Sequence, residues 1–384
     1  MRRGTIPVRG YKNPDHYGSL QPPIYQTAVF RMEGEALKSD RGFDLKYSRE
    51  ENPTLRPLEE VLARLEEGVD ALAFNSGMAA LSTVFLALLE AGSSILAPME
   101  SYGATLRLLA SLEKYGIRLR KAYPDTEIYI EELKASRPTV AFFETITNPN
   151  LKVFDVPEVI KAARDLGAWV VVDNTFATPV LITPIAHGAD LVAHSASKYL
   201  AGHNDVIGGA VVAASRELVE ELWLWRAMLG TIMQPFEAYL TLRGVKTLGV
   251  RFEQQCKNAM AVAEFLVEHS KVAEVMYPGL STHPHHHIAR KLFGGRYGAV
   301  VSFKIRGGQE AAIRFFKFLK VITPSPSLGG VESIATYPIT SAASPIADEE
   351  KRLLGITEEL IRLSVGIEDP QDLIEDLDQA LKNA

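Results

Sequence analysis

The sequence has 384 residues, of which 47% are hydrophobic and 23% are charged, as in folded globular proteins with a large core. Its net charge of −6 argues against a nucleic-acid or anionic-membrane partner, because such partners select basic surfaces. Its single cysteine, Cys256, excludes an intramolecular disulfide, as is usual in a reducing compartment, and we interpret it as structural. With no signal peptide and no apolar run long enough to span a bilayer, we expect a cytoplasmic protein.

The first segment, residues 1–50, is polar and is interrupted by Pro14, Pro22, Pro23 and several glycines. This composition predicts an extended arm with little core of its own. Over residues 51–245 short apolar runs then alternate with helical patterns, which predicts an α/β domain with a mainly parallel central sheet. The expected strands are 71–74, 94–97, 139–143, 169–172, 190–193 and 210–213, and the expected helices are 78–89, 104–115, 156–166 and 216–222.

A different pattern follows in residues 246–384. A long helical stretch from 235 to about 270 leads into this part of the chain, which predicts a smaller α+β domain. Its expected strands are 299–305 and 361–367, and its expected helices are 309–319 and 370–382.

Three polar or small residues follow expected strands of the first domain. Gly77 comes after strand 71–74, Asp173 after 169–172 and Lys198 after 190–193. Ligands of such sheets bind beyond the carboxyl ends of the strands. The sequence therefore predicts that these residues share one site.

Each of these positions has a functional and a structural interpretation. The turn 75–80, which holds Gly77, suits a phosphate at a helix N-terminus, but many such turns serve geometry alone. Asp173 suits a protonated pyridine nitrogen, or equally a helix cap. Lys198, in a serine-rich loop beside apolar strands, suits a Schiff base with an aldehyde cofactor, although most lysines are surface residues.

Two further motifs offer alternative functional interpretations. Ser195 and Lys198 match the S-x-x-K pattern of serine acyl-transfer enzymes, but the chain lacks the S-D-N and K-T-G partners and has only 246–248, Lys-Thr-Leu. The histidine-rich run 283–287 lacks metal-ligand spacing. We therefore expect a solvated loop there and no metal.

Several motifs, read in order, carry a resemblance to a known family. They are Tyr47-Ser-Arg-Glu-Glu-Asn-Pro-Thr54, Ser76-Gly-Met-Ala-Ala80, Tyr102-Gly103, Glu144 to Pro149, Val172-Asp-Asn-Thr175, Ser195 to Lys198, Ser327-Leu-Gly-Gly330 and Arg362-Leu-Ser-Val-Gly366. Together they resemble the Cys/Met-metabolism family of pyridoxal 5'-phosphate (PLP) enzymes, which includes cystathionine γ-synthases and γ-lyases, methionine γ-lyases and homoserine-ester sulfhydrylases. The resemblance runs from about Pro22 to the C-terminus and implies the fold of type I PLP-dependent transferases.

The resemblance also implies a role for each matching residue. Lys198 would hold PLP covalently and move protons, Asp173 would pair with the ring nitrogen, and Tyr102 would stack on the ring and assist proton transfer. The implied phosphate ligands are Gly77, Met78, Ser195 and Ser197, with Asn148 near the ring hydroxyl, and the implied substrate ligands are Arg362 and Ser327.

The resemblance gives the arm a role as well. Tyr47 and Arg49 resemble family residues that reach the phosphate of the neighbouring subunit. It therefore implies a homotetramer built from two dimers that share their active sites.

The chain departs from the family pattern at four places. Ser197 stands where threonine is usual, and residues 340–343 replace a more usual Met-Thr-His run. Ala104 stands where methionine γ-lyases typically have cysteine, and Pro326 where many γ-synthases and γ-lyases have glutamate. Ala104 therefore argues against a methionine γ-lyase. With Pro326 in place of glutamate, the chain lacks there the carboxylate that would receive the distal amino group of cystathionine. We expect γ-replacement or γ-elimination on sulfur amino acids and homoserine esters, with cystathionine γ-synthase first and γ-lyase next. A sulfhydrylase or methionine γ-lyase is the alternative, and a catalytically inactive PLP-fold binding protein is a remote one.

Overall fold

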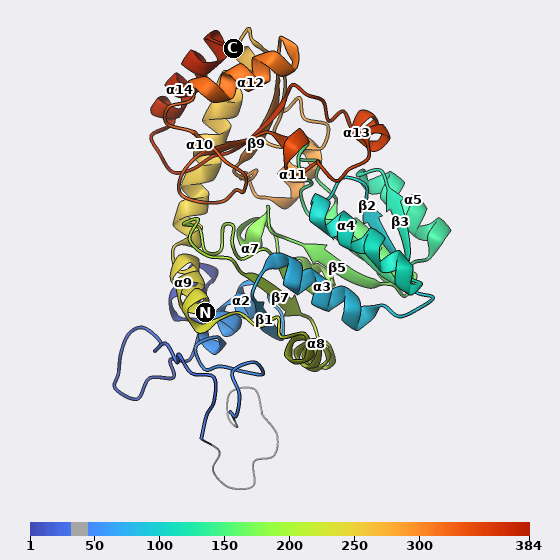
Figure 1. The fold of residues 1–384 in the computed structure, drawn as a ribbon, viewed down its shortest axis with the longest axis vertical. Helices are drawn as coiled ribbons and strands as arrows, with labels where there is room; N and C mark the ends of the chain where they lie inside the picture. Colours follow the sequence, from blue (N-terminus) through green and yellow to red (C-terminus); the bar gives the residue numbers. More distant parts are fainter. Residues whose placement is uncertain (32–44) are drawn as a thin grey trace.

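A seven-stranded sheet forms the centre of the larger part of the molecule (Figure 1). The computed structural model describes residues 1–31 and 45–384. The strands are β1 (Asp70–Phe74), β2 (Ser94–Pro98), β3 (Arg118–Ala122), β4 (Val140–Glu144), β5 (Trp169–Asp173), β6 (Leu191–His194) and β7 (Gly209–Ala213), in the order β1-β7-β6-β5-β4-β2-β3. Strands β2 to β6 pair in parallel and only β7 runs antiparallel to its neighbours. The prediction of a mainly parallel α/β sheet is confirmed.

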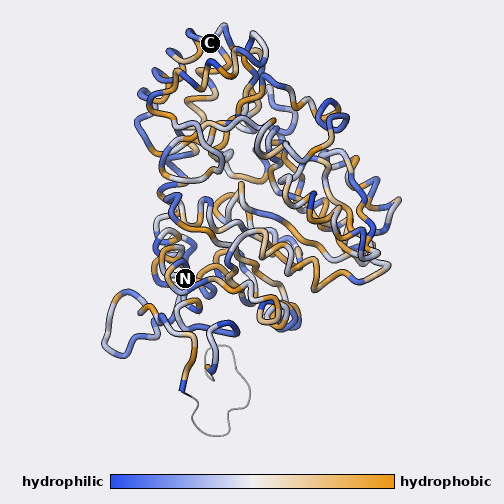
Figure 2. Tube along the Cα trace, in the orientation of Figure 1, coloured by the Kyte–Doolittle hydropathy of each residue, from blue (hydrophilic) through white to orange (hydrophobic). Residues whose placement is uncertain are grey.

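Helices cover both faces of this sheet because its strands are apolar on both sides. Along β1, Ala71 and Ala73 point into one hydrophobic cluster, and Leu72 and Phe74 point into another. The first cluster is closed by α2 (Arg56–Leu65), α5 (Thr126–Ser136), α6 (Val156–Asp165) and α9 (Pro235–Val245), and the second by α3 (Gly77–Leu88), α4 (Gly103–Leu112) and α8 (Arg216–Leu229). In Figure 2 the central strands are correspondingly hydrophobic.

A second sheet lies at the end of the molecule opposite the N-terminal segment (Figure 1). Its strands are β8 (Val272–Met276), β9 (Val300–Ile305), β10 (Thr323–Pro324), β11 (Ile334–Thr336) and β12 (Leu360–Ser364), in the order β10-β11-β12-β9-β8. A third hydrophobic cluster joins it to α10 (Leu248–Glu268), α12 (Gly308–Phe318) and α14 (Pro370–Lys382). The short helices are α1 (Ile6–Arg9), α7 (Thr178–Leu181), α11 (His286–Leu292) and α13 (Asp348–Leu354).

Two expectations from the sequence are wrong in detail. The helical stretch 235–270 is two helices, α9 and α10, because Thr247 leaves the helical conformation with φ −111° and ψ 4°. The histidine-rich run is no solvated loop, since His283 is only 6% exposed and α11 begins at His286. His285 accepts a hydrogen bond at its Nδ1 from the Val153 N–H, 2.9 Å away, which ties this segment to the connection after β4.

The N-terminal segment has little core of its own. Residues 32–44 of the predicted arm lie outside the described residues; around them, Val29 and Tyr47 form an isolated bridge. The chain becomes buried at Glu51 and Asn52, just before α2.

The residues that the structure describes contain no helix suited to crossing a membrane. The division at residues 50 and 245, like the cytoplasmic location, stays a prediction.

Candidate active site

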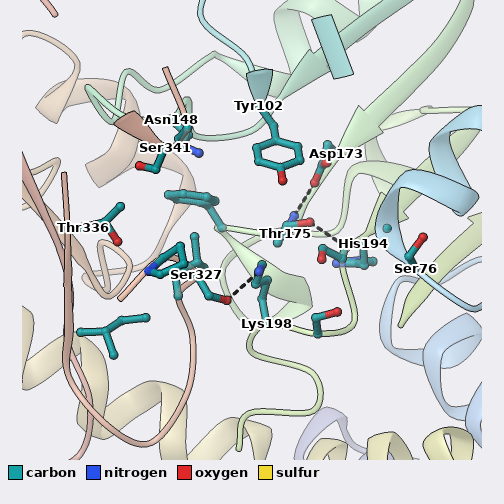
Figure 3. A pocket seen from close by; sticks show the side chains of 18 of the residues that line it. Ser76, Tyr102, Asn148, Asp173, Thr175, His194, Lys198, Ser327, Thr336 and Ser341 are labelled. Carbon is teal, nitrogen blue, oxygen red and sulfur yellow. Dashed lines mark hydrogen bonds between the residues drawn. The ribbon is translucent and has the colours of Figure 1, made fainter. Parts of the chain in front are cut away.

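A cavity of about 950 Å³ opens at the carboxyl ends of the large sheet, where the second sheet meets it. Every predicted site residue except Tyr47 and Arg49 lines it. These lining residues are Gly77, Met78, Tyr102, Asn148, Asp173, Ser195, Ser197, Lys198, Ser327 and Arg362. Figure 3 shows Tyr102, Asp173, Lys198 and Ser327 around one space. Because β1, β2, β4, β5 and β6 all run in one direction, residues from five strand ends meet at one edge.

One end of the cavity is built to receive an anion. Helix α3 starts there at Gly77, where its first N–H groups have no partner within the helix. A Cβ added at Gly77 would lie 2.9 Å from Cβ of Ser195, so glycine is required for the close approach of these two segments. Ser197 lies beside them, and its Oγ accepts from the Gly208 N–H at 2.9 Å. This cradle of N–H and hydroxyl groups suits a phosphate.

Lys198 lies at the centre of the cavity. Its Nζ donates to Oγ of Ser327 at 2.6 Å, so the S-x-x-K partner Ser195 is not the residue it contacts. Burial, and secondarily the charge of Arg362, lowers the pKa of Lys198 to about 8. An appreciable fraction of this amine is therefore neutral near neutral pH and is able to attack an aldehyde.

Asp173 ends β5 opposite Glu144, which ends β4. Oδ1 of Asp173 accepts from the Thr175 N–H at 2.9 Å, and Thr175 Oγ1 accepts from the Ser195 N–H at 2.9 Å. Burial raises the pKa of Asp173, and burial together with the nearby Asp173 raises that of Glu144. A cation placed against Asp173 would reverse this shift, which makes the carboxylate a suitable partner for a protonated ring nitrogen.

Arg362, on β12, is buried in the wall formed by the second sheet. Its guanidinium donates to Oδ1 of Asn148 at 2.9 Å and to the carbonyl oxygen of Ser327 at 2.7 Å. Its Nε has no partner among the described residues. Ser327 itself has φ 94°, a conformation that favours glycine. The wall thus presents an oriented guanidinium, the group that best pairs with a carboxylate.

Tyr102 supplies the aromatic surface of the site. It precedes α4, and its N–H donates to Oε1 of Glu144 at 2.6 Å. Its side chain is 46% exposed and projects into the cavity (Figure 3). An exposed ring in this position is able to stack on a flat ligand.

Tyr47 and Arg49 do not reach this cavity in their own chain. Arg49 donates to the carbonyl oxygen of Ala227, and its guanidinium lies 5.5 Å from the centre of the Tyr47 ring. Tyr47 is 41% exposed. Their predicted contact is with a second copy, so it stays a prediction.

Sequence reasoning missed several residues of the site. Thr175 and Glu144 were part of quoted motifs but received no role, although a hydroxyl two residues after Asp173 was a usable signal. His194, Thr336 and Ser341 also line the cavity.

Cys256 is buried, and burial raises the pKa of its thiol to about 12, as its structural interpretation requires. Among the described residues no three His, Cys, Asp or Glu side chains are placed to hold a metal ion.

Comparison with known proteins agrees with this geometry. The family described as "Cys/Met metabolism PLP-dependent enzyme" matches residues 4–382. The chain belongs to this family. An L-methionine γ-lyase of Fusobacterium nucleatum is 40% identical over 99% of this chain and 98% of its own length, and a cystathionine γ-lyase of Bacillus subtilis is 40% identical over the whole of both chains. The crystal structure of cystathionine γ-synthase from Xanthomonas oryzae, 39% identical, covers 100% of this chain and 98% of that one with a TM-score of 0.95.

Membership of the Cys/Met metabolism family makes PLP the cofactor, and the cavity suits it. The cradle at Gly77 matches a phosphate, Lys198 an aldehyde and Asp173 a protonated ring nitrogen. The relatives differ in reaction, so family membership alone does not select one activity.

Proposed function

We propose that this chain is a cystathionine γ-synthase, which joins an O-acyl-L-homoserine to L-cysteine and releases the acyl group as an acid. The proposal is supported above all by the arrangement of a partly neutral Lys198 beside Arg362 in one cavity with Tyr102 and Asp173. A closely related γ-elimination of cystathionine would use the same residues.

The cofactor is held at three points. The N–H groups of Gly77 and Met78 and the hydroxyls of Ser195 and Ser197 bind the phosphate. Asp173 pairs with the ring nitrogen and Asn148 lies by the ring hydroxyl, while Tyr102 stacks on the ring. PLP, when bound, withdraws electrons from the substrate Cα, which lowers the cost of removing the Cα proton.

The substrate is oriented by Arg362, whose guanidinium binds its carboxylate with help from Ser327. Lys198 Nζ takes the proton from Cα and is held toward it by the 2.6 Å contact with Ser327. Once it has given up that proton, the same amine is available for the second proton transfer, at Cβ, and the Tyr102 hydroxyl assists the departure of the γ-substituent.

Two subunits complete each site. Tyr47 and Arg49 of one chain contact the phosphate held by the next, and two such dimers form a homotetramer. The support is the exposed arm, whose Tyr47 and Arg49 lie outside their own cavity.

A second candidate is favoured by the wall around Pro326. This residue lines the cavity with Ser325, Thr336, Ser341 and Ala342, none of which carries a charge. Glu332, also a lining residue, accepts from Asn204 at 2.7 Å. The five positions around Pro326 offer no carboxylate to a distal ammonium group, which suits a thiol without one, so a sulfhydrylase or a methionine γ-lyase is the second function.

The test compares four incubations of the PLP-loaded protein, with products identified by mass spectrometry. Cystathionine formed from O-acyl-homoserine and cysteine, with L-cystathionine alone left intact, supports the synthase. Cysteine and 2-oxobutyrate released from cystathionine would replace the synthase with a γ-lyase. Conversion of O-acyl-homoserine with sulfide but not with cysteine would select the sulfhydrylase, and 2-oxobutyrate from methionine would select the methionine γ-lyase. Lys198→Ala is the control in each incubation.

A further inference from the structure

A fully buried carboxylate, Glu66, lies behind the cofactor end of the cavity, just after α2. Its side chain is 0% exposed. One oxygen, Oε1, accepts from Nδ2 of Asn174 at 2.8 Å and interacts with Nε2 of His194 at 2.7 Å. The other oxygen, Oε2, has no partner among the described residues.

The two partners of Glu66 adjoin the residues that hold the cofactor. Asn174 follows Asp173 at the end of β5, and His194 ends β6 directly before Ser195. A carboxylate only accepts hydrogen bonds, so the proton of this contact resides on Nε2 of His194. Glu66 thereby fixes the orientation of the imidazole and keeps Nε2 protonated.

His194 matters because of the position of Asp173. Asp173 must be ionised to hold a proton on the ring nitrogen, but burial raises its pKa, and the second carboxyl group Glu144 faces it in the paired strand. The Thr175 hydrogen bond and the positive charge of His194 act in the opposite direction and lower the pKa of Asp173. His194 directly follows Ala193, the residue of β6 that is paired with Asp173.

A purely structural role for Glu66 would not need its charge. An amide oxygen accepts the same two hydrogen bonds, whereas a buried carboxylate with an unpartnered oxygen carries a large desolvation cost. The charge is explained if an imidazolium lies against it.

We propose that Glu66 is a positioning residue that holds His194 as the cationic neighbour of Asp173, and so maintains the positive charge on the ring nitrogen of PLP. Charges then alternate from Glu66 through His194 and Asp173 to the ring. This inference rests on the proposed function in one respect, the pairing of Asp173 with the ring nitrogen.

The test is a pH titration of the visible absorption band of PLP-loaded Glu66→Gln without substrate. Glutamine keeps the shape and the hydrogen bonds and removes the charge. We expect the midpoint to rise by about one pH unit, a tenfold change, because a less positive ring repels a proton on the Lys198 nitrogen less. The turnover rate at saturating substrate should fall about tenfold with KM changed much less.

Glu59→Gln is the matched control. Glu59 lies on α2 and is also 0% exposed; it forms a buried ion pair with Arg226 at 2.8 Å, and its Oε1 accepts from the Ala73 N–H at 2.9 Å. We expect this variant to lose stability without a change in the titration. A midpoint shift of equal size in both variants would overturn the proposal, since it would follow from any lost buried charge.

His194→Asn gives a second, independent result if Glu66→Gln fails to fold. It should shift the midpoint in the same direction, and the double variant should shift no further than either single variant. An unchanged midpoint in a folded, PLP-loaded Glu66→Gln or His194→Asn protein contradicts the inference. A wild-type protein that shows no visible band with PLP would instead overturn the proposed function, and the inference with it.

Discussion

Burial and a neighbouring cation give Lys198 its reactivity. Solvent exclusion disfavours the ammonium form, and the Arg362 guanidinium repels it further, so the pKa of Lys198 falls to about 8. The contact with Ser327 then orients the amine. A lysine on the surface would carry the same chemical group but would be almost wholly protonated at neutral pH.

The pH dependence of PLP uptake follows from this shift. The neutral amine is the nucleophile, so the rate at which cofactor-free protein incorporates PLP should increase with pH and level off above about pH 8. Stopped-flow absorbance at constant ionic strength measures it. A rate that continues to increase toward pH 10, as for an ordinary lysine with a pKa of about 10.4, would contradict the assignment.

Some residues of the site were accessible from local sequence and some were not. Gly77, Asp173 and Lys198 each follow a recognisable strand, and short motifs surround them. Glu66 and His194 meet only in the folded chain, across 128 residues of sequence. No local pattern around Glu66 distinguishes it from an ordinary acidic residue at a helix end.

At the scale of elements, the predictable strands of the large sheet are those whose residues are apolar on both faces. Strand β5 is a run of Trp and Val that is apolar on both faces, whereas β3 lies at the sheet edge and contains Arg118, Arg120 and Lys121, so its pattern resembles a loop. The break between α9 and α10 was missed for a similar reason. Neither residue next to Thr247 is a proline or a glycine, so the sequence gives no sign of the break. In the structure, Oγ1 of Thr247 accepts a hydrogen bond at 3.0 Å from Nε of Arg251, four residues along the chain.

The segment from His283 to α11 predicts a dependence of stability on pH. Burial, with the charges of neighbouring histidines and Lys152, lowers the pKa of His283 to about 4 in the folded protein. The unfolded chain binds this proton near pH 6.5, so the contribution to stability is complete above pH 6.5 and is lost as pH falls toward 4. The loss is ~3 kcal/mol by linkage.

Urea unfolding at pH 7 and pH 4.5 of the wild type and of His283→Asn measures this effect. Asparagine does not titrate, so the variant should lose less stability over this interval than the wild type does. The exposed His287, changed to asparagine, is the control. Equal pH dependence in all three proteins would show that His283 is not held neutral by the fold.

At the scale of the whole molecule, the arm predicts a shared site. The cavity contains Lys198, whereas Tyr47 and Arg49 lie outside it. If the arm of one subunit completes the site of the other, Lys198→Ala and Arg49→Ala should each be nearly inactive alone. Co-expressed, they should regain about a quarter of the wild-type sites, since half of the dimers are mixed and each mixed dimer has one intact site. No recovery in confirmed mixed dimers would place Arg49 in the site of its own chain.

The large sheet was predictable except for its edge strand β3, because alternating strands and helices allow few topologies. The five-stranded sheet was not. Its strands β10 and β11 are only two and three residues long, too short for a pattern of their own; β10 pairs with β11, and β11 pairs with β12. Yet β12 carries Arg362 into the cavity, so this sheet completes the site.

The central claim is that Lys198 carries the cofactor, and chemical trapping tests it most directly. The PLP-loaded protein is reduced with borohydride, digested and mapped by mass spectrometry. The account predicts one pyridoxyl group, on the peptide containing Lys198, and none in Lys198→Ala. A pyridoxyl group on another lysine of the wild type, or one retained by Lys198→Ala at wild-type yield, would contradict it.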